Sequence, residues 1–406
     1  MTKELKGGLD RRTFLAGTAA ITGALAAPGL LRAAPAPVKI GLIHPVTGAL
    51  SYSGAQCRAG GQMAIDDINA AGGIKSLGGA QIEAILGDSL SKPDVGASET
   101  AKAVEAGAAG IVAGYASAIT LATAQEAAKT NTPHIVDVGV TDGIIALGLK
   151  NVFRFSPGYG KIAQDAVTAL DEINKAAGAP AKTVVIVHED SAFGTGTAKL
   201  LATELPKHGF EILKVIAHPT PTRDFTNIAL QVKAANPDII IPANYYNEYV
   251  LFARTIQQQQ IKPKAIYSVL GGAASSYKFV KEFPEAAEGV MDTNHWFNPL
   301  SPLAQARKAA TEAKGLFYTY EVYLTYNAVA LLADAIERAG STDKDKVIAA
   351  LNSSTWDKHG MPYGPTQFVN GQNTGAQAVN TQVLGGKIEV IRPAEFASAK
   401  VKFPLA

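Results

Sequence analysis

Short apolar runs alternate with amphipathic stretches along most of this 406-residue chain. The runs are continuously apolar, which is typical of strands buried on both faces of a parallel sheet. Amphipathic stretches between such strands are typical of the helices that cover the sheet. We expect strands at residues 38–43, 82–86, 110–112, 134–138, 184–188, 211–216, 239–242, 265–269 and 289–294. We expect helices at residues 97–106, 119–129, 162–176, 196–208, 225–234 and 246–257.

The alternation of strands and helices pauses around residues 151–159 and then starts again. A domain commonly holds about 100–200 residues, so this chain is long enough for two substantial cores. The pattern therefore predicts an α/β protein with two doubly wound, Rossmann-like lobes.

Residues 38–74 show the repeating unit most clearly. The apolar run at 38–43 is followed by a loop rich in Pro, Gly, Ser and Tyr, and then by a helix that ends at Gly72 and Gly73. This order places a polar loop where the carboxyl end of a strand meets the amino end of a helix, the usual position of a small ligand.

The first 33 residues resemble a twin-arginine export signal. Arg11 and Arg12 precede an Ala/Gly-rich apolar run to Leu31, which is too short and too poor in large apolar residues to predict a membrane span. Cleavage is expected near Ala33. Export should then leave a soluble protein in the periplasm. Beyond residue 33 the chain holds 32 Lys/Arg and 33 Asp/Glu, a net charge of −1, which argues against nucleic acid as a partner.

Motifs for catalysis or metal binding are missing from the sequence. It contains no Gly-x-Ser-x-Gly elbow, no His-Glu-x-x-His and no phosphate-binding Gly-x-x-x-x-Gly-Lys-Ser/Thr. The seven histidines are dispersed, and the single cysteine excludes an intrachain disulfide. We therefore expect a protein that is not an enzyme and that has no cofactor or metal.

Two polar loops at the expected edge of the first sheet suit an anion. Ser117 and Thr120 follow the strand at 110–112 and open a helix, whose amino end attracts negative charge. Thr141 follows the adjoining strand and could meet the same anion, which predicts a carboxylate site. The alternative for Ser117 is a helix cap without a ligand.

Several landmarks together resemble the leucine/isoleucine/valine-binding family of periplasmic solute receptors, the type I substrate-binding proteins of ABC importers. They occur over residues 38 to about 395 in the family's order, and we identify them as PVTG at 45–48, AIDDINAAGG at 64–73, Ser117-x-x-Thr120, VFR at 152–154, DSAFGTG at 190–196, DFT at 224–226 and AEGV at 287–290. Each motif alone is weak, and their shared order and spacing carry the resemblance.

The resemblance implies two lobes joined by three crossovers, which close on a ligand. The first lobe would hold residues 38–157 and 289–363, and the second 158–288 and 364–406, with one crossover at Gly364-Pro365. A permease and ATPase complex would be the partner, and we expect a monomer. A sensory receptor of the same fold is the alternative.

The resemblance also implies ligand contacts. Ser117 matches the serine that binds the ligand carboxylate, and Gly139 and Thr141 match neighbouring contacts. Aromatic and loop positions around the ligand are Tyr52 or Ser53, Tyr115, Phe193, and Tyr245 or Tyr246. Rigid aromatic walls bury a large area with little loss of entropy.

The chain departs from the family where the ligand ammonium would bind. An acidic residue is usual there, and the corresponding position is Gly271. Because a buried ammonium without a counter-charge is costly, an ordinary amino acid is disfavoured unless Asp142, Asp190 or Glu248 substitutes. Aromatic or oxo acids are then expected to compete at least as well as leucine or valine. His295-Trp296 is a further candidate near the cleft, or else a packed strand end.

Overall fold

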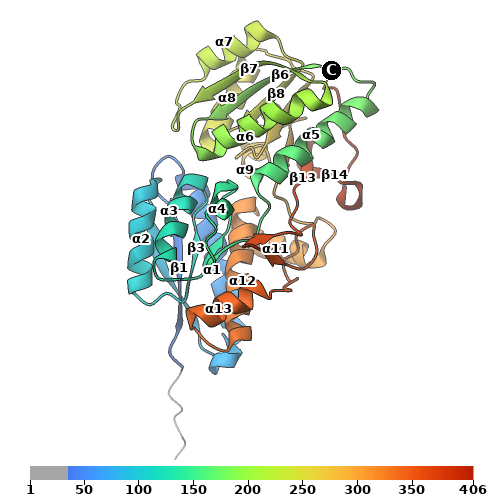
Figure 1. Cartoon of the computed structure of the whole chain (residues 1–406). Helices are drawn as coiled ribbons and strands as arrows, with labels where there is room; N and C mark the ends of the chain where they lie inside the picture. The colour runs from blue at the N-terminus through green and yellow to red at the C-terminus, as the bar shows by residue number, and fades with distance from the viewer. Residues whose placement is uncertain (1–34, 406) are drawn as a thin grey trace, which may run out of the picture. The chain divides into compact units, whose positions relative to one another are not determined.

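Parallel strand pairing builds two seven-stranded sheets in the computed structural model, which describes residues 35–405 (Figure 1). The first sheet has the order β11-β12-β5-β4-β3-β1-β2 and the second has the order β14-β13-β10-β9-β8-β6-β7. We call each sheet with its helices a lobe. The two-lobed α/β architecture predicted from the strand and helix pattern is confirmed.

The first sheet is parallel except for a small hairpin at its edge. Its strands are β1 (Val38–His44), β2 (Ile82–Asp88), β3 (Gly110–Ala113), β4 (His134–Val136), β5 (Val152–Arg154), β11 (Phe368–Val369) and β12 (Gln372–Asn373). Its helices are α1 (Ser51–Ala70), α2 (Pro93–Glu105), α3 (Ser117–Ala128), α4 (Gly143–Ala146), α11 (Pro302–Ala313), α12 (Tyr320–Ala339) and α13 (Lys344–Asn352).

The second sheet ends in a larger antiparallel hairpin. Its strands are β6 (Thr183–Glu189), β7 (Glu211–His218), β8 (Ile239–Ala243), β9 (Ala265–Val269), β10 (Met291–Asn294), β13 (Val379–Leu384) and β14 (Lys387–Arg392). Its helices are α5 (Tyr159–Ala176), α6 (Ala192–Glu204), α7 (Thr226–Ala235), α8 (Tyr246–Gln258), α9 (Tyr277–Glu282) and α10 (Pro284–Ala287).

The nine expected strands and six expected helices are all present, with ends that differ by a few residues. Five strands were not expected: β5, β11, β12, β13 and β14. The first three have two or three residues each, too few to show a period. β13 (VNTQVL) has three consecutive polar residues and therefore no continuous apolar run, and it pairs antiparallel with both β10 and β14.

The strand pairing corrects two of the expected lobe boundaries. Residues 291–294, expected in the first lobe, form β10 between β9 and β13 of the second sheet. Residues 368–373, expected in the second lobe, form β11 and β12 in the first sheet, where Gln372 pairs with Arg154. The chain therefore changes sheets three times, after β5, β10 and β12. Gly364-Pro365 precedes β11 and is not a crossover.

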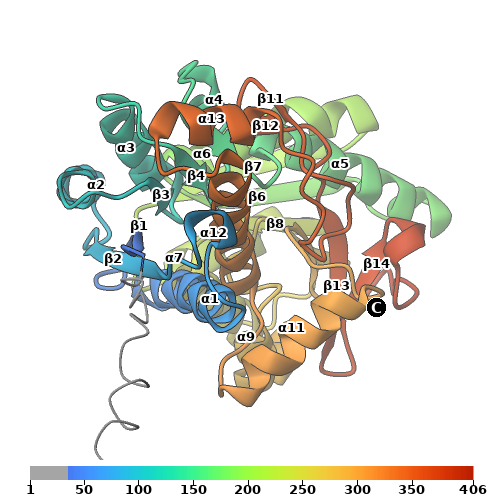
Figure 2. The same cartoon turned by 90° about the horizontal axis from the view of Figure 1, so that it is seen from below.

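The helices α1 and α12 pack closely on one face of the first sheet (Figures 1 and 2). Small residues of α1 permit this approach. A Cβ atom added to Gly60 would lie 2.1 Å from the Val322 carbonyl oxygen, and one added to Gly61 would touch Leu42 of β1. The Gly-rich composition of residues 51–70 thus lets backbone approach backbone, which fixes α1 beside the sheet.

Among residues 35–405, no helix combines the length and the apolar character that crossing a membrane requires. The export signal expected at residues 1–33, with its cleavage near Ala33, lies outside the described residues.

Replacing Gly60 by alanine should lower the free energy of unfolding, because the new methyl group would collide with the backbone of α12. Overpacking of this kind costs about 1–3 kcal/mol. Urea unfolding followed by circular dichroism measures the loss. Gly364→Ala is the matched control, since a Cβ atom there meets nothing within 4 Å. Equal stability of the two variants would contradict the close contact between α1 and α12.

Candidate ligand-binding site

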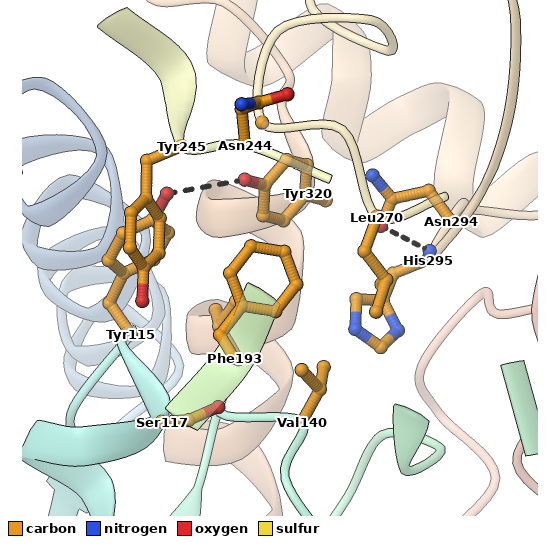
Figure 3. A pocket seen from close by; sticks show the side chains of 12 residues that line it. Tyr115, Ser117, Val140, Phe193, Asn244, Tyr245, Leu270, Asn294, His295 and Tyr320 are labelled. Atoms are coloured by element: carbon orange, nitrogen blue, oxygen red, sulfur yellow. Dashed lines mark hydrogen bonds between the residues drawn. The ribbon is translucent and has the colours of Figure 1, made fainter. Parts of the chain in front are cut away.

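A cavity of about 30 Å³ lies where the carboxyl ends of strands from both sheets face each other (Figure 3). This volume has room for one or two water molecules, so the side chains around the site lie close together. Both lobes contribute to its lining, which consists of Tyr115, Ser117, Val138, Val140, Phe193, Asn244, Tyr245, Leu270, Gly272, Asn294, His295 and Tyr320. The expected ligand edge of the sheets is therefore the edge at which the cavity is found.

Ser117 lies on the cavity and connects the two polar loops of the first lobe. Its Oγ accepts a hydrogen bond from the Thr141 backbone N–H at 3.2 Å. Ser117 is the first residue of α3 and makes no capping bond to that helix, whose N-cap is Ala116. The alternative of a simple helix cap is therefore wrong. The loops after β3 and β4 do meet, as their positions on adjoining strands predict.

Three other expected residues of this edge lie just outside the lining. Thr120 donates its hydroxyl to the Ala116 carbonyl at 3.0 Å, and its side chain fills the space against Gly139. The Thr141 hydroxyl lies 3.2 Å from the Tyr159 hydroxyl. Val140 presents its side chain to the cavity instead. These residues support the loop that carries Ser117.

Aromatic rings form the wall of the cavity, and they come from both lobes. The rings of Phe193 and Tyr245 are 5.2 Å apart, those of Tyr115 and Tyr245 are 5.8 Å apart, and the Tyr115 and Tyr320 hydroxyls are 3.5 Å apart. The structure places Tyr115, Phe193 and Tyr245 on the cavity, where they were expected. Tyr320, at the start of α12, was not expected, because the sequence around it contains no motif that indicates a binding site.

Tyr52, Ser53 and Tyr246 lie together beside the cavity, next to Tyr115 and Tyr245, in a region too tightly packed to hold a water molecule. The Tyr52 and Tyr246 rings are 4.1 Å apart. Because these two residues belong to different lobes, their contact closes one side of the site. Of the neighbours Tyr245 and Tyr246, the first lines the main cavity and the second forms this contact.

The region of Gly271 carries no acidic side chain towards the cavity. Leu270 and Gly272 line it, while the Gly271 N–H donates to Asp292 at 3.1 Å. None of the twelve lining residues is charged. The proposed substitutes do not line the cavity either: Asp142 pairs with Arg154 at 2.9 Å, Asp190 is exposed, and Glu248 is buried elsewhere on α8.

His295 lines the cavity and Trp296 does not. Trp296 is buried in the core, stacked on Phe297 at 5.1 Å. Of the two alternatives proposed for this dipeptide, a place at the cleft holds for His295 and a packed position holds for Trp296. His295 could have been found from the sequence only by knowing that the crossover after β10 passes the ligand edge.

A buried carboxylate, Asp137 at the end of β4, holds the first-lobe half of the cavity. One oxygen accepts from the N–H groups of Tyr115 and Val138, at 3.3 and 2.7 Å. The other lies 2.8 Å from His44 Nε2 and accepts from Thr325 at 2.9 Å. Although burial opposes ionisation, these hydrogen bonds hold the pKa of Asp137 below its usual value. Cys57 lies near this His–Asp pair, within 4.8 Å.

Glu321, next to Tyr320, is also buried, but its carboxyl has fewer hydrogen bonds than that of Asp137 to offset the cost of burial. Its Oε1 has no hydrogen-bond partner, and burial raises its pKa to about 7. Glu321 is therefore largely protonated in the folded protein at mildly acidic pH. Because its pKa is ordinarily 4.5, its contribution to stability is fully present below that pH and is lost as the pH rises through about 7.

Replacing Glu321 by glutamine should remove this pH dependence. Between pH 5 and pH 7.5 the unfolding free energy of the wild type should fall relative to that of Glu321→Gln, because the buried carboxyl must ionise. Each pKa unit corresponds to about 1.4 kcal/mol. Urea titrations at several pH values test this, with Glu105→Gln on the exposed surface of α2 as the control. Parallel pH profiles for wild type and Glu321→Gln would contradict it.

Comparisons with known proteins agree along nearly the whole chain. The family described as "Periplasmic binding protein" matches residues 37–386. Leu/Ile/Val-binding protein homolog 7 of Brucella abortus is 28% identical over 388 residues, covering 91% of this chain and 95% of the relative.

Solved structures show the same similarity. The leucine binding protein LivK from Thermotoga maritima is 25% identical with a TM-score of 0.75, covering 87% of this chain and 97% of that one. The branched-chain amino acid transporter substrate binding protein LivJ from Streptococcus pneumoniae, in complex with isoleucine, is 25% identical with a TM-score of 0.75, covering 91% and 100%. These relatives are substrate-binding proteins and not enzymes, which confirms the expectation that the chain is not an enzyme.

Proposed function

Because the chain belongs to the leucine/isoleucine/valine-binding family of periplasmic binding proteins, we propose that it traps a small carboxylate between its lobes and delivers it to an ABC importer. The observation that carries the ligand class is the Ser117 hydroxyl, which lines the cavity and accepts from the Thr141 N–H. Because its oxygen accepts that bond, its hydrogen is free to be donated to a carboxylate oxygen at the amino end of α3.

The shared lining supports a mechanism of capture by closure. Residues of the first lobe, such as Ser117, and of the second lobe, such as Phe193 and Tyr245, surround one cavity. The lobes also meet through the Asn247 side chain, which donates to the Ala49 carbonyl at 3.1 Å. A ligand that contacts both lobes binds the closed form more tightly than the open form, so it shifts the population towards closure. The importer would then distinguish loaded from empty protein by its shape.

We also propose that the protein acts as a monomer in the periplasm. The family's occurrence among exported solute receptors and the twin arginines at Arg11 and Arg12 support this location.

Replacing Ser117 by alanine should weaken carboxylate ligands, because a charge-assisted hydrogen bond is lost while the cavity keeps its shape. A loss of about 1–3 kcal/mol is expected, which is roughly 5- to 150-fold in Kd. Isothermal titration calorimetry with amino, aliphatic and aromatic acids, each beside the amide that lacks its carboxylate charge, gives the measurement. Ser353→Ala, at an exposed serine, is the control. Unchanged affinity in Ser117→Ala, or equal binding of acids and amides, would reject the carboxylate site.

Replacing Arg11 and Arg12 together by lysine should block export, since the twin-arginine pathway reads the arginine pair itself. Cell fractionation of a host with that pathway should find the wild type in the periplasm, shortened near Ala33, and the variant in the cytoplasm at full length. Normal processing and location of the variant would contradict the proposed signal.

A further inference from the structure

His295 is the most isolated polar side chain on the ligand cavity. It follows β10 on the crossover back to the first lobe, lines the cavity and is 1% exposed. Neither ring nitrogen has a hydrogen-bond partner. Its backbone is fixed, because its N–H donates to the Asn294 side chain at 2.8 Å and its carbonyl accepts from the Tyr323 hydroxyl at 2.8 Å. The backbone of this lining residue is therefore fixed, and both of its ring nitrogens are without a partner.

The neighbouring polar groups are already engaged and cannot turn to the imidazole. The Asn294 amide donates to Asp292 at 2.9 Å, and its oxygen accepts from the His295 backbone. The Tyr320 ring lies 6.4 Å from the imidazole. A buried imidazole that meets no protein group is costly, so a polar group of the ligand is the expected partner.

The imidazole is uncharged, and its surroundings disfavour a cation. Burial, with Arg154 nearby, lowers the pKa of His295 to about 3. The neutral ring presents one N–H donor and one bare nitrogen. One other atom of a lining side chain has no hydrogen-bond partner, the Oδ1 of Asn244. It belongs to a neutral amide. An ammonium group here would find no counter-charge on the lining.

Arg154, whose charge opposes protonation of His295, also supports the loop at the end of the cavity where the carboxylate is proposed to bind. Arg154 Nη1 donates to the carbonyls of Val140 and Thr141, both at 2.9 Å, and the Thr141 N–H in turn donates to Ser117. Figure 3 shows Ser117, Val140 and His295 around the Phe193 ring. Because Ser117 and His295 line the same cavity, a ligand whose carboxylate meets Ser117 can present a substituent to the imidazole.

Building on the proposed function, we propose that His295 binds an uncharged oxygen substituent beside the ligand carboxylate, so that the preferred ligands are 2-oxo or 2-hydroxy acids rather than 2-amino acids. The imidazole N–H would donate to a keto oxygen. A ligand hydroxyl could either accept a hydrogen bond from the imidazole N–H or donate one to the unprotonated ring nitrogen. The pocket rejects an amino acid by leaving its ammonium without a partner.

The test is a series of ligands with one carbon skeleton: leucine, its 2-oxo analogue, its 2-hydroxy analogue and the parent acid without a substituent. Calorimetry at pH 7 should rank the oxo or hydroxy acid at least about tenfold tighter than the parent acid, with leucine the weakest. The same series built on phenylalanine covers an aromatic side chain.

Two substitutions identify the residue responsible. His295→Phe keeps a flat ring without nitrogens, so it should cost the oxo acid about tenfold while leaving the parent acid within about twofold. His295→Gln retains a donor and an acceptor and should recover part of the loss. His359→Gln is the matched control: His359 is a buried histidine that lies off the cavity and bonds the Gly364 carbonyl at 3.1 Å. It should leave the preference among ligands unchanged.

The outcomes separate this inference from the proposed function. Failure of every carboxylate to bind would reject both. Binding of acids with leucine the tightest would keep the proposed function and overturn the role of His295, and loss of that leucine binding in Glu321→Gln would assign the counter-charge to Glu321. Equal losses for the oxo acid and the parent acid in His295→Phe would show a packing role only, and would also overturn it.

Discussion

The Asp137 carboxylate is the interaction on which the first-lobe half of the cavity depends. It is fully buried, and it accepts from two loops, one side chain of β1 and one of α12. Two of these donors are the backbone N–H groups of Tyr115 and Val138, whose side chains line the cavity. Tyr115 also has a left-handed backbone, with φ at +61°. A buried charge with four donors holds such a conformation because releasing any of them would leave an unpaired polar group in the core.

The second lobe builds its half with different chemistry. It offers aromatic area from Phe193 and Tyr245, neutral amides, and the crossover that carries His295. Neither half encloses a ligand alone. Because the lining is divided between the lobes, the closure proposed above would also cover the ligand. The crossover after β10 is thus both a connection and part of the site.

Much of the site could be predicted because polar loops after parallel strands necessarily reach one edge of a sheet. Ser117, Tyr115, Phe193 and Tyr245 were found in this way or by resemblance, and they line the cavity. Thr120, Gly139 and Thr141 were placed on the correct loops but behind the lining. Leucine and isoleucine are ligands named for relatives. Near Gly271, where the resemblance led us to expect no acidic residue, the cavity lining is uncharged.

The sequence by itself determined the two-lobed α/β plan with nine of its strands and six of its helices, since buried parallel strands need apolar runs and the helices between them need an apolar face. It did not determine which lobe receives residues 291–294 and 368–373, because a short strand joins whichever sheet edge its backbone can reach. The tertiary structure also decided that His295 lines the cavity while Trp296 packs in the core. Adjacent residues of an extended segment point to opposite sides, and only the position of that segment between two sheets shows which side is the cavity.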